Sequence, residues 1–192
     1  MTDDPLGDAT VRPAVPADLP AVLHSLTSAA QWSRERGESG WPVPFPEEAV
    51  RPSLERGELY VAEWNGEVVG SFVLRYEDEA FWGSQPPVAG YLHQLAVRRD
   101  RPVRGLGRRL IERAEALVRE TKRPLIRLDC VATNRSIIAY YEAVGFRPVR
   151  VVPYPHGDEF DVLLMEKRLD GGWVRPVSKA VPYRRKVRAT LK

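Results

Sequence analysis

A short stretch with two glycines and several arginines is the part of this sequence best suited to bind a ligand. Gly105 and Gly107 lack side chains that would keep a phosphate from the backbone, while Arg104, Arg108 and Arg109 add positive charge. An amphipathic stretch follows Gly105, and the first amides of a helix have no partner inside that helix. The pattern predicts an anion site at a helix start, with a pyrophosphate as the expected ligand.

Two other phosphate loops do not fit these residues. The chain contains no G-x-x-x-x-G-K-[ST] motif, so a Walker-type nucleotide site has no support. Leu110 stands where the dinucleotide motif G-x-G-x-x-G needs its third glycine. Neither nucleotide hydrolysis nor dinucleotide binding is therefore expected.

Three residues have side chains that can attract an amine or move a proton. Tyr141 shares a helical face with two isoleucines, as a core tyrosine also would. His93 lies on an apolar strand, on the same face as Leu95, where an imidazole serves either as a base or as a structural residue. Glu77 heads an acidic run to Glu79 that either attracts a cationic amine or forms a solvated loop.

Periodicity predicts the order β-α-α-β-β-β-α-β-α-β-β for the elements that must position these side chains. The clearest signal is a hairpin whose tight turn is Asn65-Gly66. A strand over 90–97, a helix from Gly105 and a strand over 125–131 predict a parallel crossover. The order predicts an α/β fold, with a mixed, mostly antiparallel central sheet and helices on both faces.

The remaining expected elements lie before and after this parallel crossover in the sequence. We expect Asn134 to cap the helix that carries Tyr141, and Glu115 and Arg119 to pair on the solvent side of the long helix. The other expected elements are strands at 10–14, 59–64, 68–75, 146–152 and 160–166, helices at 18–37, 47–55 and 135–143, and a loop at 77–87.

Composition indicates one soluble domain of ordinary size. The 192 residues are 43% hydrophobic and 29% charged, and no stretch is apolar enough to span a bilayer. Residues 1–9 lack the basic and apolar regions of a secretory signal. Cys130 is the single cysteine and there are three histidines, which give no zinc-type ligand cluster. We therefore expect a cytoplasmic protein without a metal ion or a membrane partner.

The C-terminal end differs in charge from the rest of the chain. Residues 171–192 include seven basic residues and no acidic one, which leaves 22 basic against 26 acidic residues in 1–170. We expect a domain over 1–170 and a basic extension over 171–192. A basic arm can bind nucleic acid, but the apolar residues within it favour an extension that solubilises the domain or packs on it. Nucleic acid is not the expected partner.

Two motifs carry a resemblance to a known family. The stretch from Leu95-Ala-Val to Gly105-Leu-Gly resembles the acetyl-CoA motif of the GCN5-related N-acetyltransferase (GNAT) superfamily, Q/R-x-x-G-x-G/A after an L-A-V strand. The segment from Asn134 to Phe146 is similar to a second signature, an asparagine followed by a tyrosine and then Gly-Phe. Pro102 stands where the family has Gln or Arg. The resemblance extends from about residue 11 to residue 169.

This resemblance implies a GNAT fold and an enzyme that moves an acetyl group from acetyl-CoA to a primary amine. Coenzyme A would pair with the strand over 90–97, as if the pantetheine arm were an added strand. Its thioester would enter a gap where this strand diverges from the strand over 125–131. An amide of Leu95 or Ala96 would stabilise the oxyanion. The residues implied in coenzyme binding are Leu95, Ala96, Val97, Val103, Arg104, Gly105, Leu106, Gly107, Arg108, Asn134 and Tyr141.

The catalytic candidates are Tyr141, which by the resemblance protonates the coenzyme A thiolate, and His93 and Glu77 on the amine side. In the histone-type branch a glutamate base stands at the position that is Tyr91 here, so that assignment does not carry over. The expected acceptor is a small-molecule amine, in a pocket shaped by Trp41 to Pro46, Trp82 and the His156 turn.

Two alternatives stay open from the sequence. One is acetylation of protein lysines or N-termini. The other is a catalytically silent acyl-CoA-binding module whose tail binds a polyanion. The sequence also leaves a homodimer open.

Overall fold

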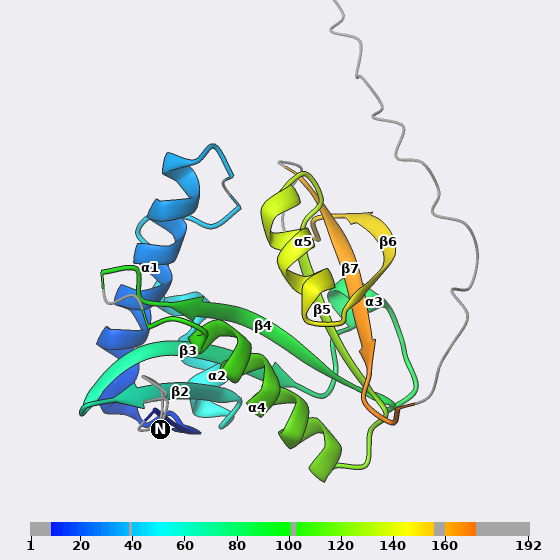
Figure 1. Ribbon diagram of the computed structural model, residues 1–192, viewed down its shortest axis with the longest axis horizontal. Helices are drawn as coiled ribbons and strands as arrows, with labels where there is room; N and C mark the ends of the chain where they lie inside the picture. Colours follow the sequence, from blue (N-terminus) through cyan, green and yellow to red (C-terminus); the bar gives the residue numbers. More distant parts are fainter. Residues whose placement is uncertain (1–8, 39, 101–102, 156–159, 172–192) are drawn as a thin grey trace, which may run out of the picture.

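The computed structural model describes residues 9–38, 40–100, 103–155 and 160–171. A seven-stranded sheet with the order β1-β2-β3-β4-β5-β7-β6 lies at its centre (Figure 1). Within it β4 and β5 pair in parallel and the other neighbours pair antiparallel. The expected α/β fold with one parallel crossover is confirmed. Of the predicted basic extension, Gly171 alone falls within the described residues.

The long elements agree with those expected from the sequence. The strands are β1 (Thr10–Pro13), β2 (Leu59–Trp64), β3 (Glu67–Arg75), β4 (Ala89–Val97), β5 (Leu125–Val131), β6 (Arg147–Pro153) and β7 (Asp161–Arg168). The helices are α1 (Leu19–Glu35), α2 (Arg51–Glu55), α3 (Glu79–Trp82), α4 (Leu106–Glu120) and α5 (Arg135–Ala143), with 3-10 turns η1 (Pro16–Asp18) and η2 (Glu47–Ala49).

Two short helices differ from the expectation. The second helix is divided into η2 and α2, because Pro52 has no amide hydrogen with which to continue a helix from the preceding turn. The helix α3 lies inside the segment expected to be a loop, and its four residues are too few to show a helical period.

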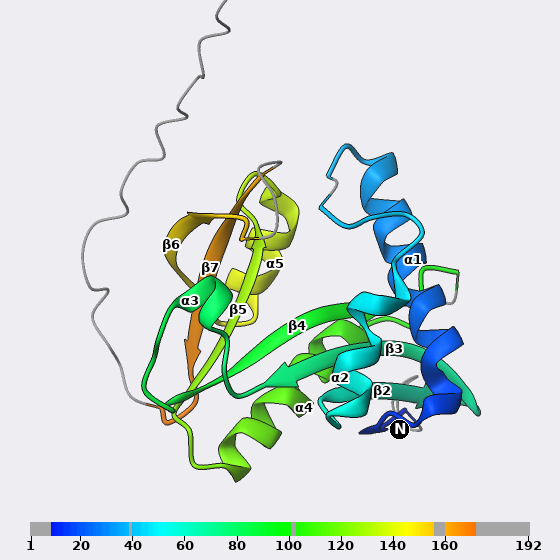
Figure 2. The same cartoon turned by 180° about the vertical axis from the view of Figure 1, so that it is seen from behind.

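Helices cover both faces of the sheet, with α4 and α5 on one face and α1 and α2 on the other (Figures 1 and 2). A Cβ atom at Gly90 would lie 2.4 Å from the Val118 side chain, so glycine at this position lets α4 approach β4 closely. The apolar stripe of α4 is fully buried against the sheet and fixes where this helix begins; it consists of Leu106, Leu110, Ile111, Ala114 and Val118.

Two turns form as their residues predict. Asn65 and Gly66 have φ angles of 51° and 76°, as a tight hairpin turn between β2 and β3 requires. Gly145 has a φ of 100° and follows Val144, the C-cap of α5.

The strands β4 and β5 separate halfway along their length. Their pairing begins at Ala89 and Leu125 and ends at Leu92 and Leu128. Beyond this point β4 continues with β3 and β5 continues with β7. A gap therefore opens between residues 93–97 and residues 129–131, as the resemblance implied.

A bulge at the start of this gap changes which way the β4 side chains point. Gln94 has a φ of 49°, and the register with β3 shifts between Ser71 and Val73. His93 faces Phe81 of α3, whereas Leu95 packs on the α4 side of the sheet. The expectation that His93 and Leu95 share a face is wrong, because the extra residue interrupts the two-residue alternation.

The expected pair of Glu115 and Arg119 on α4 forms, but its expected place on the solvent side is wrong for Glu115. Glu115 is buried, and its carboxylate lies 2.5 Å from Lys167 of β7 and 3.3 Å from Arg119. This carboxylate thus ties α4 to the sheet. No helix in the described part of the chain has the length and apolar character that crossing a membrane demands.

Candidate functional site

The start of α4 has the backbone geometry expected of an anion site. Gly105 has a φ of 79°, a left-handed conformation that favours glycine, and it directly precedes the helix. The Leu106 amide donates to the Val103 carbonyl, and the Arg109 amide donates to the Gly105 carbonyl. The amides of Gly107 and Arg108 belong to the first helical turn, where the helix dipole is positive.

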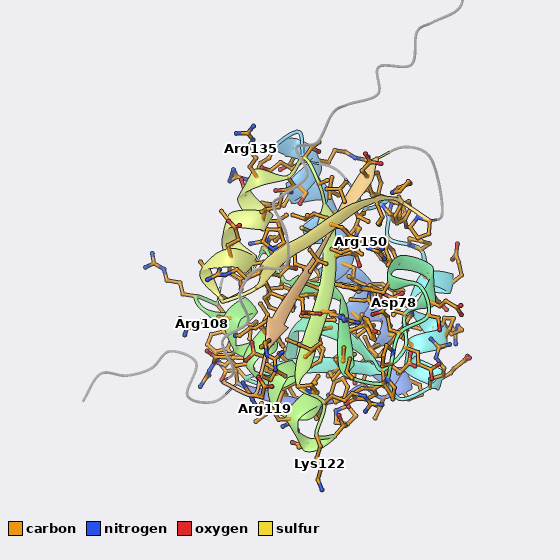
Figure 3. The ribbon with its side chains drawn as sticks, turned by 90° about the vertical axis from the view of Figure 1, so that its right-hand side faces the viewer. Asp78, Arg108, Arg119, Lys122, Arg135 and Arg150 are labelled. Atoms are coloured by element: carbon orange, nitrogen blue, oxygen red, sulfur yellow. The ribbon has the colours of Figure 1, made fainter. Side chains whose placement is uncertain are left out.

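The side chains around this helix start differ from the expectation in part. Arg108 pairs with Glu112 at 2.8 Å and points away from the body (Figure 3). Tyr140 of α5, which the sequence did not single out, has its hydroxyl 2.9 Å from the position of a Cβ on Gly107. Arg101 and Pro102 lie outside the described residues. Arg104, directly before Gly105, and Arg108 are both exposed, and the Tyr140 phenol approaches the backbone of the helix start.

The helix α5 places Asn134 and Tyr141 on the same side of the sheet as α4. Asn134 caps α5, because its Oδ1 accepts a hydrogen bond from the Ile137 amide at 2.9 Å. Tyr141 is buried in the core beneath α4 and α5, with its ring 5.8 Å from that of Phe146. Burial, reinforced by the charges of the nearby Cys130 and Asp129, raises the pKa of Tyr141 well above its ordinary value. The phenol thus keeps its proton at physiological pH.

Cys130 indicates how a thiol behaves in this environment. Burial, together with the charge of Asp129, raises the pKa of the Cys130 thiol to about 12. A thiolate in these surroundings is therefore strongly basic and takes a proton readily.

On the opposite face, His93 lies between two carboxylates. Its Nε2 is 3.3 Å from Asp78 Oδ2 and its Nδ1 is 3.4 Å from Asp129 Oδ1. The Nε2 contact is not aligned as a hydrogen bond, so Asp78 interacts through charge. Burial by itself lowers the His93 pKa, but Asp129 and Asp78 outweigh it and raise this pKa to about 9. The imidazole is therefore protonated at neutral pH.

Sequence reasoning missed one member of this cluster and chose the neighbour of another. Asp129 is a lone carboxylate on the apolar strand β5, which was the available signal. Glu77 is exposed, while the adjacent Asp78 contacts His93. Asp78 directly precedes α3 and is labelled in Figure 3. Within the described residues, no group of three His, Cys, Asp or Glu side chains is arranged to hold a metal ion.

The raised pKa of His93 predicts a pH dependence of stability. The folded-state value of about 9 lies above the ordinary 6.5, so the added stability is complete below pH 6.5 and disappears as the pH rises through 9. The free energy of unfolding should fall by at most ~3 kcal/mol over this range. Urea unfolding at several pH values measures it. His93→Gln should remove the slope, whereas His24→Gln, at an exposed histidine, should keep it.

A cavity of about 630 Å³ opens on the face that carries His93. Val131 lines it, and Asp129 lies two residues earlier on β5, so both side chains point to the same face. The cavity is lined by Arg34, Gly40, Trp41, Pro42, Val131, Thr133, Tyr154 and Phe160.

Aromatic side chains connect the cavity to His93. The rings of Tyr154 and Phe160 stack at 4.6 Å, and the Phe81 ring lies 6.1 Å from Tyr154 and 6.0 Å from His93. Trp41 lines the cavity as expected. Trp82 does not, because it is buried against Tyr91 in the core. His156 lies outside the described residues.

Comparison with known proteins identifies similar sequences and folds. The model of the acetyltransferase (GNAT) family matches residues 26–146. The chain is 30% identical over 142 residues to the uncharacterised N-acetyltransferase YesJ of Bacillus subtilis, covering 70% of this chain and 79% of that protein.

Solved structures share the fold. The ribosomal-protein-S18-alanine N-acetyltransferase of Escherichia coli superposes with a TM-score of 0.62 at 20% identity, over 86% of this chain and 99% of that chain. The acetyltransferase yncA of Salmonella typhimurium, solved with acetyl-CoA, superposes with a TM-score of 0.64 at 18% identity, over 90% of this chain and 100% of that chain.

Proposed function

The chain belongs to the GNAT family and is an acetyl-CoA-dependent N-acetyltransferase, and from this premise we propose that its acceptor is the primary amine of a small molecule. The observation that carries the proposal is the gap between β4 and β5. The helix start that suits a pyrophosphate lies on one face of the sheet, and the cavity lies on the other. Donor and acceptor would meet in the gap.

Acetyl-CoA would enter from the α4 side. Its pyrophosphate oxygens would accept hydrogen bonds from the backbone amides at the start of α4, from Val103 to Arg108. Its pantetheine arm would run along the edge of β4 from Leu95 to Val97, which β5 leaves without a partner strand. The Leu95 or Ala96 amide would then face the thioester carbonyl oxygen.

Transfer then needs one bond made and one broken. The neutral amine attacks the thioester carbonyl carbon, forming the N–C bond, and the C–S electron pair leaves with sulfur. Tyr141 gives its phenolic proton to the thiolate, and the proton lost from nitrogen balances it. Burial raises the pKa of a thiol here, as it does for Cys130, but it also raises the pKa of the Tyr141 phenol, so the transfer depends on direct contact between the phenol and the departing sulfur.

His93 would act as the base that receives the amine proton, with Asp78 and Asp129 holding its ring. Since its pKa is raised to about 9, only a minority of molecules have the neutral imidazole at pH 7.5. Turnover should therefore rise with pH up to about 9. A pH-rate profile measures this limb, and an unchanged limb in His93→Gln would remove His93 from proton transfer.

The segment after α1, which lies across the edge of the cavity, supports a small molecule over a protein as the acceptor. Ser136 at the start of α5 donates a hydrogen bond to Glu38 at 2.8 Å, and a Cβ at Gly40 would lie 2.5 Å from Val131. The segment after α1 thus reaches β5 and α5 across the cavity edge. A folded protein surface would have to displace these contacts.

A thiol-release screen tests the proposal. The full chain, acetyl-CoA and a panel of primary amines should give free coenzyme A and an N-acetylated product by mass spectrometry. A matched panel of lysine peptides and N-terminal peptides should give little release. Faster release with peptides than with any small amine would reverse the choice of acceptor.

A further inference from the structure

The cavity has one charged side chain among the described residues that line it. Arg34 comes from the last turn of α1, and no carboxylate among the described residues pairs with it. The other lining residues are apolar, small or uncharged. A guanidinium with five donors beside an apolar wall suits a carboxylate better than any neutral group.

Negative charge lies near the cavity, two residues along β5 from Val131 of its lining. Asp78 and Asp129 contribute two negative charges, and the protonated His93 between them contributes one positive charge. The cluster therefore has a net negative charge that attracts an ammonium group. Asp129 is the more accessible carboxylate, with 18% of its side chain exposed against 5% for Asp78.

Much of the remaining lining is aromatic. Trp41 contributes one ring, and the stacked pair of Tyr154 and Phe160 contributes two more. Such a wall buries an apolar or aromatic group at little conformational cost. A volume of about 630 Å³ suits a molecule of amino-acid to drug size.

We propose that the acceptor is a free amino acid with an apolar or aromatic side chain, whose carboxylate pairs with Arg34 and whose amino group points towards Asp129 and His93. This inference rests on the proposed function and names the substrate class of the same site. An amine without a carboxylate would leave Arg34 without an anion, and a peptide N-terminus would replace the carboxylate by a neutral amide.

Calorimetry on the full chain tests the inference separately from catalysis. The probes are L-phenylalanine, L-phenylalaninamide and phenethylamine, which share the amine and the ring and differ at the carboxylate. We expect L-phenylalanine to bind about 10- to 100-fold more tightly than the other two, the range for a hydrogen bond to a charged group. 3-Phenylpropionate, which has no amine, should bind measurably through its carboxylate.

Two variants at the C-terminal end of α1 separate the contact made by Arg34 from the effect of losing one positive charge. Arg34→Gln should bring the three amines within about twofold of one another, as expected when the charged partner is lost. Arg36→Gln, two residues further along and outside the cavity lining, should keep the preference. Equal affinities in the unchanged protein, or a preference that survives Arg34→Gln, would overturn the inference.

The same samples distinguish failure of the proposed function. In one outcome, L-phenylalanine binds through Arg34, but neither it nor any amine in the panel releases coenzyme A. That result would support the amino acid as ligand and contradict the proposed acetyl transfer to small amines. If phenethylamine is acetylated as fast as L-phenylalanine, the transfer stands and the amino-acid assignment fails.

Discussion

Replacing Tyr141 by phenylalanine should lower kcat by about 100- to 10,000-fold, the usual contribution of a positioned general acid. The change removes one hydroxyl and keeps the ring that packs on Phe146, so the fold should survive. Because the lost interaction forms with the departing thiolate, the KM for acetyl-CoA should change little. Steady-state kinetics with an active amine, together with thermal unfolding, measure both quantities.

Tyr140→Phe is the matched control for this experiment. Its hydroxyl lies over Gly107 at the helix start, and its ring is partly buried at the edge of the core. Its loss should affect coenzyme affinity more than kcat. A Tyr141→Phe enzyme with kcat within about threefold of the parent would exclude the phenol as the proton donor.

Replacing Gly105 by glutamate should weaken acetyl-CoA binding by about 100-fold or more. The φ of 79° costs a residue with a Cβ atom roughly 1–2 kcal/mol. A carboxylate at the start of α4 also repels a pyrophosphate in the place where the helix dipole attracts it. Calorimetric titration with coenzyme A measures the change without the need for an acceptor.

Gly57→Glu separates the local charge from backbone strain. Gly57 has a φ of 69°, and no atom lies within 4 Å of where its Cβ would be. It precedes β2, away from the start of α4. Both variants should lose similar thermal stability, while Gly57→Glu should bind coenzyme A within about twofold of the parent. Equal binding by Gly105→Glu would refute the phosphate loop.

Local rules predicted most of the fold. Asn65-Gly66 specifies its turn through positive φ angles, and the runs of β5 and α5 were placed to the residue because their patterns are strong. The bulge at Gln94 could not be seen, since nothing in the residue type distinguishes a bulged glutamine from a regular one. One extra residue then reversed the face assigned to Leu95.

The site was predictable only where a motif spans consecutive residues. The helix start at Gly105 and the cap at Asn134 depend on neighbouring residues, so their sequences suffice. Asp129 contacts His93 from another strand, and Lys167 donates a hydrogen bond to the buried Glu115 from 52 residues away in the sequence. Such pairs depend on tertiary packing, which periodicity does not encode.

The bulge at Gln94 has an evolutionary consequence. Because it directs His93 to one side of β4 and Leu95 to the other, one strand contributes side chains to both faces of the sheet. Under the proposed function, mutations in the segment after α1 would diversify substrate choice while the coenzyme site stays under separate selection. New specificities become accessible without rebuilding the rest of the enzyme.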